Sequence, residues 1–383
     1  MSGSPAQRAD VRSEFAPDTV AYNFEAETRI RAGFVGAGGH SYRNVYPTFQ
    51  YAPVELVAVC DLEVDRAAAY ARLFGAERHY ADHRQMLARE QLDAVFIVTS
   101  YHPDGRVQAV DLALDALAAG VHVWMEKPTA ATLDEVDALR RAAGASGRHV
   151  MTGMKKIFTP AVERVKRLIA EPAFGRPGSI SLRYPQALPP LEERGDPRAL
   201  RGLLDHIYHP ASIVNYLLGP IHRITYEWEP FRGGSVTSIR FVSGAVGQLH
   251  LAAGSSGSSP LERLELVGDG ANVVVENGVN VTYYRRAALP AYGRALSYLV
   301  DDDVAPLRWE PEFSLGQLCN KNLFLLGYVP EVLHFCASVL SGQPPVKGTL
   351  EDTLEVVKLF EAYRTAPPGV PVEINPASAE ARV

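Results

Sequence analysis

The stretch IRAGFVGAGGHS at residues 30–41 decides the fold. Its first six residues are apolar enough for a buried strand, and a G-x-G-x-x-S turn then runs from Gly36 to Ser41 ahead of a candidate helix. Glycines permit a tight bend and a close backbone approach to a pyrophosphate, and helical N–H groups attract its negative charge. The turn therefore predicts a dinucleotide site with these candidate contacts: Gly36, Gly38, Gly39, His40 and Ser41.

An acidic residue ends the next expected strand, at residues 54–60. Asp61 lies 25 residues after Gly36, where a carboxylate would accept hydrogen bonds from an adenosine ribose. The carboxylate would repel a 2′-phosphate, so we expect NAD to bind more tightly than NADP. Arg43 and Arg66 are the cations that could reverse this preference. A structural turn with a solvated aspartate is the alternative.

Strands and helices alternate around this turn. Buried strands are expected at 30–35, 54–60, 92–98, 121–125 and 149–153, and amphipathic helices at 64–74, 104–119 and 133–143. This alternation predicts a parallel sheet, and with the turn it predicts an α/β Rossmann domain over residues 29–153 after a polar tail at 1–28.

The periodicity changes beyond a helix expected at 159–171. Short strands rich in valine, isoleucine and tyrosine are expected at 180–184, 222–228, 236–242, 247–251, 261–266, 272–275 and 281–284. They predict an open, mostly antiparallel sheet in a second, α+β domain at 154–383. Helices are expected at 210–218, 330–340 and 350–363, and a long loop at 186–201.

Composition excludes several classes of protein. The chain has 383 residues and a formal charge of −6, which argues against binding to nucleic acid or anionic lipid. No apolar run approaches the roughly 20 residues that cross a bilayer, and residues 1–28 do not resemble a secretory signal. Three widely spaced cysteines fit neither a disulfide framework nor a metal site, so we expect a cytoplasmic protein without a metal.

Five motifs follow one another along the chain. They are GAGG at 36–39, Cys60-Asp61, Val98-Thr99-Ser100, Glu126-Lys127-Pro128, and Leu203-Leu204-Asp205 with His209. In this order they resemble the Gfo/Idh/MocA oxidoreductase family over residues 30–366, and EKP and D-x-x-x-H are the specific part. The resemblance implies a nicotinamide-dependent dehydrogenase or reductase acting on a secondary alcohol or ketone of a sugar, cyclitol or derivative.

The resemblance also implies residue roles. Lys127 would touch the reacting hydroxyl, Asp205 would support it, and His209 would be the general acid or base. The chemistry is sound by itself, because a neutral histidine can take a hydroxyl proton and an ammonium stabilises the developing alkoxide. Asp205 and His209 would share a helix face, although Pro210 favours a helix entrance there. Lysine is also the exception in this chain, with seven lysines against 31 arginines.

Further contacts follow from the same motifs. The expected cofactor contacts also include Thr99, Ser100, His102, Glu126 and Lys127, and the expected substrate contacts are Lys127, Lys156, Asp205 and His209. Lys155, beside Lys156, stands at a position where the family often has a basic residue, so either lysine could reach cofactor or substrate; equally, the two could be a solvated pair at a strand end. Ile207 and Ser212 stand where the family often has glycine and aspartate, which leaves the substrate open.

Two other functions fit the same fold. One is a glycosidase that uses bound NAD transiently, and the other is a non-catalytic sensor of cofactor or sugar. The presence of Lys127, Asp205 and His209 favours chemistry over sensing. We also expect a homodimer or homotetramer built through the second domain, because its sheet needs cover. The aromatic residues that suggest this surface are Trp228, Phe231, Tyr283, Tyr284 and Tyr298.

Overall fold

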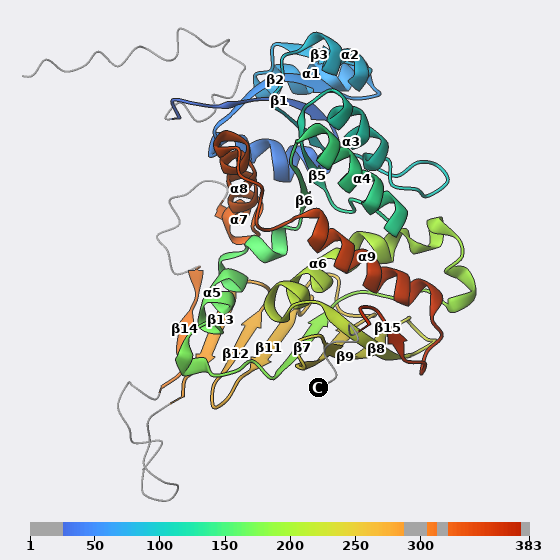
Figure 1. The fold of residues 1–383 in the computed structure, drawn as a ribbon, viewed down its shortest axis with the longest axis vertical. Coiled ribbons are helices and arrows are strands. Elements are labelled where there is room, and N and C mark those ends of the chain that lie inside the picture. Colours follow the sequence, from blue (N-terminus) through green and yellow to red (C-terminus); the bar gives the residue numbers. More distant parts are fainter. Residues whose placement is uncertain (1–25, 287–304, 312–320, 377–383) are drawn as a thin grey trace, which may run out of the picture.

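The computed structural model describes residues 26–286, 305–311 and 321–376 (Figure 1). Most of the expected tail at 1–28, and Tyr298, lie outside these residues. No helix within the described ranges is long and apolar enough to cross a membrane. The two sheets lie in different halves of the molecule, and helices fill the space between them.

The first half contains a six-stranded parallel sheet of order β3-β2-β1-β4-β5-β6. Its strands are β1 (Ile30–Val35), β2 (Val54–Cys60), β3 (Arg78–Tyr80), β4 (Ala94–Ile97), β5 (His122–Glu126) and β6 (Val150–Gly153). The helices between them are α1 (Val64–Phe74), α2 (His83–Arg89), α3 (Ala109–Ala118) and α4 (Leu133–Ser146). The predicted Rossmann fold is confirmed, and the strand order reverses beside β1, which opens a crevice at the carboxyl ends of the strands.

The helix expected after the glycine turn is irregular. A π-helical turn over Ser41–Val45 passes into a 3-10 segment over Tyr46–Gln50, with a proline at its start. Tyr46 and Phe49 are fully buried in this segment, and Tyr46 stacks on Phe34 with ring centroids 3.9 Å apart. Residues 41–50 therefore form π-helical and 3-10 turns instead of the expected α-helix, and their large aromatic rings pack against β1.

The second half contains a nine-stranded sheet of order β14-β13-β12-β11-β7-β10-β9-β8-β15. Its pairs are antiparallel except for β7 with β10, so the predicted mostly antiparallel sheet is confirmed. The strands are β7 (Ser179–Tyr184), β8 (Ile221–Trp228), β9 (Ser235–Phe241), β10 (Val246–Leu251), β11 (Arg263–Val267), β12 (Asn272–Glu276), β13 (Asn280–Tyr284), β14 (Leu307–Trp309) and β15 (Val372–Glu373). The helices are α5 (Pro160–Leu168), α6 (Pro197–Leu218), α7 (Lys321–Leu325), α8 (Tyr328–Ser341) and α9 (Leu350–Thr365), with a 3-10 turn at Lys155–Phe158.

Helix α6 corrects two expectations. It begins at Pro197, inside the expected loop at 186–201, and it continues through Pro210 instead of starting there. A proline inside a helix costs about 3 kcal/mol. Burial on both sides of Pro210 offsets this cost, and the Tyr208 hydroxyl holds both the N–H and the C=O of Ala130 (3.1 and 2.7 Å).

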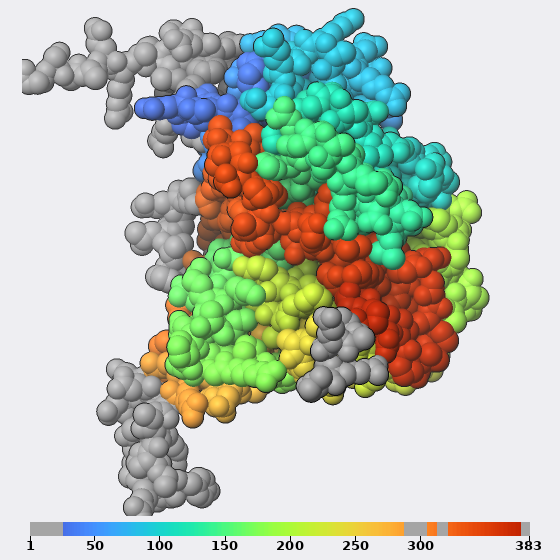
Figure 2. All heavy atoms as spheres, viewed as in Figure 1, coloured from blue at the N-terminus to red at the C-terminus, as the bar shows by residue number. Residues whose placement is uncertain are grey.

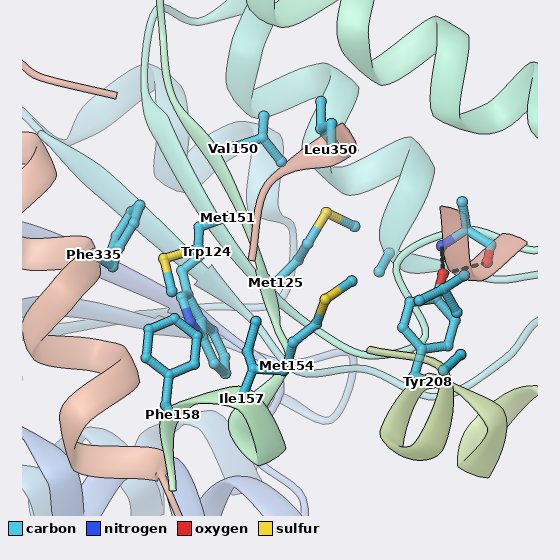
Figure 3. Packing of buried hydrophobic residues seen from close by; sticks show 14 of the residues in the cluster. Trp124, Met125, Val150, Met151, Met154, Ile157, Phe158, Tyr208, Phe335 and Leu350 are labelled. Atoms are coloured by element: carbon cyan, nitrogen blue, oxygen red, sulfur yellow. Dashed lines mark hydrogen bonds between the residues drawn. The ribbon is translucent and has the colours of Figure 1, made fainter. Parts of the chain in front are cut away.

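Helices α8 and α9 return from the second sheet to the Rossmann half. Helix α8 packs against β1 and the irregular helical segment, and α9 packs against α4, α6 and β6. Figure 2 shows this red segment lying against the green-blue Rossmann half. Phe335 of α8 enters the apolar cluster around Trp124 and Met151 (Figure 3). The parallel sheet is thus covered on one side by residues more than 170 positions downstream of its last strand.

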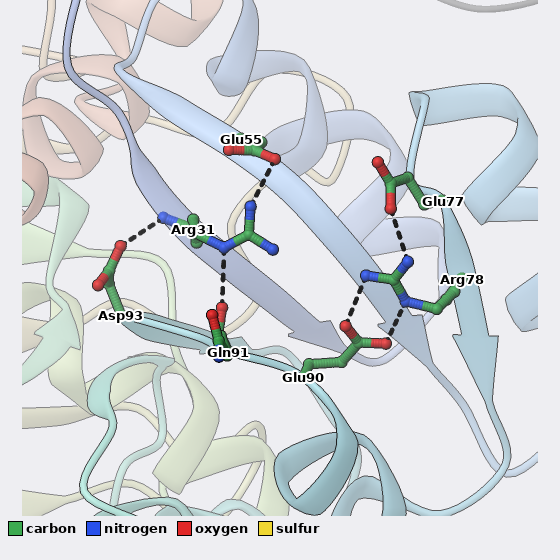
Figure 4. Close-up of polar contacts among 7 residues, drawn as sticks. All are labelled: Arg31, Glu55, Glu77, Arg78, Glu90, Gln91 and Asp93. Carbon is green, nitrogen blue, oxygen red and sulfur yellow. Dashed lines mark hydrogen bonds and ion pairs between the residues drawn. The ribbon is translucent and has the colours of Figure 1, made fainter.

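Two groups of ion pairs lie at the amino ends of the Rossmann strands (Figure 4). Arg31 donates to Glu55 at 2.9 Å and to the Gln91 carbonyl at 3.0 Å, and its N–H donates to Asp93 at 2.8 Å. A second group joins Arg78 to Glu77 and Glu90. Arg31 and Glu55 are both exposed, so solvent and salt screen this pair. In the second group Glu77 and Arg78 are exposed, whereas the Glu90 side chain is buried. Both groups lie at the end of the strands opposite the crevice.

The aromatic surface expected for the second sheet is smaller than predicted. Tyr283 is buried, and Trp228 is half-buried with its Nε1–H donating to the Leu188 carbonyl. Phe231 is 89% exposed and Tyr284 is also exposed. The exposed positions of β8, β9 and β10 are mixed, because polar residues such as Arg223, Glu227, Ser238, Arg240 and Gln248 alternate with buried ones while Val236 and Val246 are also exposed.

Candidate active site

The glycine turn is shaped by a close backbone approach. Gly36 has φ = +110°, and a Cβ at this position would lie 1.9 Å from the Val98 carbonyl oxygen. Its N–H donates to the Cys60 carbonyl at 2.8 Å, so the turn is fixed between β2 and β4. At Gly38 and Gly39 a Cβ would meet nothing within 4 Å. Gly36 is therefore required by the fold, whereas Gly38 and Gly39 border open space.

Two adjoining cavities lie over the carboxyl ends of the parallel strands. One of about 250 Å³ reaches toward Asp61, and one of about 360 Å³ reaches toward Lys127. Both are lined by Gly38, Val98, Thr99 and Ser100, so they form one continuous crevice. Its length across β2, β1, β4 and β5, and the bare glycine backbone at its centre, fit a dinucleotide whose pyrophosphate lies at the turn.

Asp61 occupies the end of the crevice beside β2. One carboxylate oxygen accepts the Ala37 N–H at 2.7 Å, and the other accepts the Glu63 N–H at 2.9 Å and Arg66 Nη2 at 2.6 Å. Burial alone would raise the pKa of Asp61, but the Arg66 and backbone hydrogen bonds outweigh burial and lower it. Asp61 is therefore an anion fixed beside Arg66, one of the two cations that the sequence identified as able to reverse the preference for NAD.

Lys127 and Asp205 line the other end of the crevice, together with Glu126 and Tyr101. Lys127 follows β5, and Asp205 is on α6, so this end lies between the two halves of the molecule. Within the described residues, the Lys127 ammonium has no ion-pair or hydrogen-bond partner. No ion pair joins Lys127 to its neighbour Glu126 there, so the ammonium is available to a ligand.

Asp205 is oriented by a tyrosine instead of by the histidine one turn away. The Tyr101 hydroxyl donates to Asp205 Oδ1 at 2.8 Å. Burial and the Asp205 charge raise the pKa of Tyr101 above its usual value, so the phenol remains protonated and the carboxylate remains the acceptor. Tyr101 follows the expected Thr99-Ser100 contacts directly, and its position in the loop just after β4 is the signal that could have identified it.

His209 is buried beside these residues and does not line the crevice. It lies one helical turn after Asp205, and its ring centroid is 6.1 Å from that of Tyr184. Burial, followed by the charges of Lys127 and Lys155, lowers the pKa of His209 well below 6.5. The imidazole is therefore neutral at physiological pH, as a general base requires.

Glu126 is the least satisfied side chain of the crevice. It is 8% exposed, and both carboxylate oxygens lack a hydrogen-bond partner among the described residues. His40 Nε2 lies 3.7 Å from Glu126 Oε1. Burial raises the pKa of Glu126 to about 7, even though Lys127 and Lys155 oppose the rise, and burial lowers the pKa of His40 to about 4.

Two expected contacts lie away from the crevice. The His102 N–H donates to the Arg106 carbonyl and its carbonyl accepts the Gly105 N–H, while its Nε2 lies 3.3 Å from Asp111 Oδ2. Lys156 pairs with Glu262 at 2.6 Å and lines a separate small cavity against the second sheet. The sequence placed both residues near the motifs but could not show which way their side chains point.

Tyr328 and Glu331 were not predicted, whereas Lys155 was expected together with Lys156 as a basic residue that could reach cofactor or substrate. Lys155 donates to the Tyr328 hydroxyl at 2.7 Å behind the crevice, and Glu331 is buried one turn further along α8. No local motif connects α8 with EKP, because the contact depends on the return of the chain after the second sheet.

Among the described residues, no cluster of three or more histidine, cysteine, aspartate or glutamate side chains could hold a metal ion.

Comparison with known proteins gives the same family for both halves. A model of the oxidoreductase family with an NAD-binding Rossmann fold matches residues 30–154, and a model of the GFO/IDH/MocA C-terminal domain matches residues 162–274. Together the two matches cover more than half of the chain.

Individual relatives have low sequence identity to this chain. The chain is 24% identical to the scyllo-inositol 2-dehydrogenase (NAD(+)) of Bacillus subtilis over 91% of this chain and 97% of that protein. It is 34% identical to the D-apiose dehydrogenase of Paraburkholderia graminis over 40% of either chain. A dehydrogenase from Chromobacterium violaceum has a similar fold, with a TM-score of 0.73 and 22% identity over 88% of this chain and 94% of that chain.

Proposed function

Because the chain belongs to the Gfo/Idh/MocA family of nicotinamide-dependent oxidoreductases, we propose that its substrate is a sugar, a cyclitol or a derivative with a secondary alcohol or ketone at the reacting carbon. The observation that carries this proposal is the free Lys127 ammonium beside Asp205, at the end of a crevice that begins at the glycine turn. A reacting hydroxyl placed there would meet a cation, a carboxylate and a neutral histidine close behind.

Each residue has a distinct role in this proposal. A nicotinamide bound in the crevice would supply the acceptor for the hydride of the reacting carbon, or its donor in the reverse direction. His209, neutral through burial, takes the hydroxyl proton. Lys127 stabilises the negative charge that develops on the oxygen, and Asp205, fixed by Tyr101, orients the substrate and Lys127. His209 must reach the substrate from behind the crevice wall, so we expect substrate binding to bring the two together.

NAD is the favoured cofactor in this proposal. The Asp61 carboxylate at the crevice end still has lone pairs for ribose hydroxyls and repels a 2′-phosphate. Arg66 weakens that repulsion because it lies 2.6 Å from Asp61, but the same pairing occupies its charge. NADP remains the second choice.

The enzyme is proposed to be a cytoplasmic homodimer or homotetramer assembled through the outer face of the second sheet. Cys60 and Cys336 are both free thiols, which suits a reducing compartment. Exposed Phe231 and Tyr284 give that face apolar contact points. Light scattering at micromolar concentration should give a multiple of 41.8 kDa, and a monomer would contradict the assembly.

A substrate panel tests the function. Sugars, cyclitols and their keto derivatives are tested with NAD, NADP and the reduced cofactors, and absorbance near 340 nm reports the nicotinamide. Stoichiometric cofactor turnover with at least one polyol is the expected result. A cofactor that co-purifies and is never consumed while a glycoside is cleaved would indicate the NAD-assisted glycosidase. Binding without any turnover would indicate a sensor.

A further inference from the structure

The loop after β4, hairpin 101–107, reaches from the Rossmann half to α6. An antiparallel bridge between Tyr101 and Val107 closes the hairpin at its base. Near its tip Gly105 is buried with φ = +96°, and a Cβ there would lie 2.8 Å from the Arg198 backbone nitrogen. The hairpin is therefore a compact unit whose tip lies against the first turn of α6.

Arg201 on α6 fastens this hairpin to the helix. Its Nη2 donates to two successive carbonyls of the hairpin, those of His102 at 3.0 Å and Pro103 at 3.2 Å. Its guanidinium carbon lies 5.4 Å from the centroid of the Tyr101 ring, which is within the range of a cation–π contact. One side chain thus holds both the backbone and the aromatic ring of the hairpin, and its charged donor makes stronger hydrogen bonds than a neutral one.

Two loops of the Rossmann half bond to α6, and one contact is much more buried than the other. On the side of β5, Tyr208 is fully buried and its hydroxyl holds both backbone groups of Ala130 (Figure 3). On the side of β4, Arg201 is half-buried, and its acceptor Pro103 is exposed. The Nε–H of Arg201 is also buried without a partner among the described residues. The Arg201 contact is open to water and incompletely satisfied, so it is the easier of the two to break.

The hairpin is also part of the crevice wall. Tyr101 and Val107, its first and last residues, line the cavity of about 360 Å³ that Asp205 of α6 also lines. Because the Tyr101 hydroxyl bonds to Asp205, the hairpin and the helix form one wall at this end of the crevice. A movement of the hairpin away from α6 would open this wall, while the loop after β5 would stay attached to the helix.

We propose that Arg201 is a positioning residue that latches hairpin 101–107 onto α6 and thereby slows the departure of the dinucleotide from the crevice. The latch would open before the cofactor leaves, and the side held by Tyr208 would remain closed. A loop that must open before a ligand leaves acts on the dissociation rate more than on the association rate. The inference rests on the proposed function only in assuming that the dinucleotide binds in this crevice.

Stopped-flow displacement of NADH, followed by fluorescence, tests the proposal without a substrate. Arg201→Met keeps a long side chain over the Tyr101 ring and removes both hydrogen bonds to the hairpin. The NADH dissociation rate should rise about tenfold in this variant, because bonds from a charged donor are lost, and the association rate should change less than about twofold. Arg201→Lys keeps a charged donor without the planar fork, so its dissociation rate should rise only about threefold.

Two other variants separate the latch from general stability. Arg198→Met is the matched control, because Arg198 lies three positions earlier on α6, is exposed, and pairs with Asp196 instead of with the hairpin. It should leave the NADH dissociation rate unchanged. Tyr208→Phe removes the bonds to Ala130 on the other side of the helix. It should lower the urea midpoint of unfolding without a comparable rise in the dissociation rate.

Equal NADH dissociation rates in the wild type and Arg201→Met would overturn the proposal, and so would an equally large rise in Arg198→Met or Tyr208→Phe. If Arg201→Met does not fold, the rate in Arg201→Lys decides, and an unchanged rate there contradicts the latch.

Hydrogen exchange gives a second readout that needs no cofactor. The Gly105 N–H donates to the His102 carbonyl within the hairpin, and it should exchange about tenfold faster in Arg201→Met than in the wild type. Unchanged exchange at Gly105 would contradict the latch. Failure of NADH to bind to the wild type would instead contradict the proposed function, and the exchange at Gly105 would still report on the hairpin.

Discussion

Tyr101 donates its hydroxyl to Asp205 at 2.8 Å and so joins the end of β4 to the middle of α6 across the mouth of the crevice. Asp205 was expected to act with His209, its neighbour on the helix, yet its hydrogen bond crosses between the two halves of the molecule. The tyrosine therefore fixes the carboxylate from the cofactor side.

This contact predicts that Tyr101→Phe lowers kcat/KM by roughly 10- to 100-fold, because a hydrogen bond to a charged group contributes about 1.5–3 kcal/mol. Asp205→Asn should be milder than Asp205→Ala, since an amide oxygen can still accept from Tyr101. Steady-state kinetics on a confirmed substrate measures both. Wild-type kinetics for Tyr101→Phe would show that the contact is structural.

His209→Ala should lower kcat by roughly 10² to 10⁴ and leave NADH binding nearly intact, because general-base catalysis contributes about that factor. Lys127→Ala should cause a comparable loss. The double variant should lose less than the product of the two, since both residues act on one proton transfer. Unchanged turnover in His209→Ala would leave Lys127 or a tyrosine as the base.

Asp61→Ala should shift cofactor preference toward NADP. The substitution removes the repulsion of a 2′-phosphate and releases Arg66, which now lies 2.6 Å from the carboxylate. We expect the ratio of NADPH to NADH affinity to rise by roughly 10- to 100-fold. Fluorescence titration of both cofactors measures the ratio, and Arg66→Ala in the same background should remove the part of the gain that Arg66 supplies.

Two glycines of the turn should behave differently when replaced by alanine. Gly36→Ala places a Cβ 1.9 Å from the Val98 carbonyl oxygen at φ = +110° and should destabilise the fold by more than about 2 kcal/mol. Gly38→Ala meets nothing within 4 Å, so it should unfold like the wild type but bind NADH at least about tenfold more weakly. Equal NADH affinity in a folded Gly38→Ala would place the pyrophosphate elsewhere.

Glu331 predicts a pH dependence of stability. Its pKa is raised by burial, so its contribution is fully present below its ordinary value of 4.5 and is lost as pH rises through the folded-state pKa. Glu331→Gln lacks this titration. Urea unfolding from pH 5 to pH 9 should show the variant gaining stability relative to wild type as pH rises, whereas exposed Glu227→Gln should show no such trend.

Local sequence predicted the elements whose pattern depends on neighbours in the chain. The bounds expected for β1, β2 and α1 agree with the structure, because a buried parallel strand and an amphipathic helix each have a clear periodicity. β3 was missed, since three mostly exposed residues carry no such signal. Pro210 was taken to begin a helix that in fact passes through it, because the burial that offsets its cost depends on tertiary packing.

The residues of the site divide in the same way, into those that local motifs predicted and those whose placement depends on tertiary packing. The motifs placed Lys127, Glu126 and Asp205 in one crevice with the glycine turn, since each follows a strand end or lies on the facing helix. They could not show that Lys156 turns away toward Glu262, because that depends on a side-chain direction. Tyr328 comes from α8, and no spacing in the sequence connects that helix with β5.

The return of α8 onto β1 also limits how this protein can be recombined. A chimera that exchanges only the first 154 residues would separate Phe96 from Phe335, whose rings lie 5.5 Å apart, and would pair a foreign Rossmann sheet with this chain's α8. A graft of cofactor specificity therefore needs two crossovers, one after β6 and one around α8. The nucleotide site thus depends on two separate segments of the chain, and both must be exchanged together.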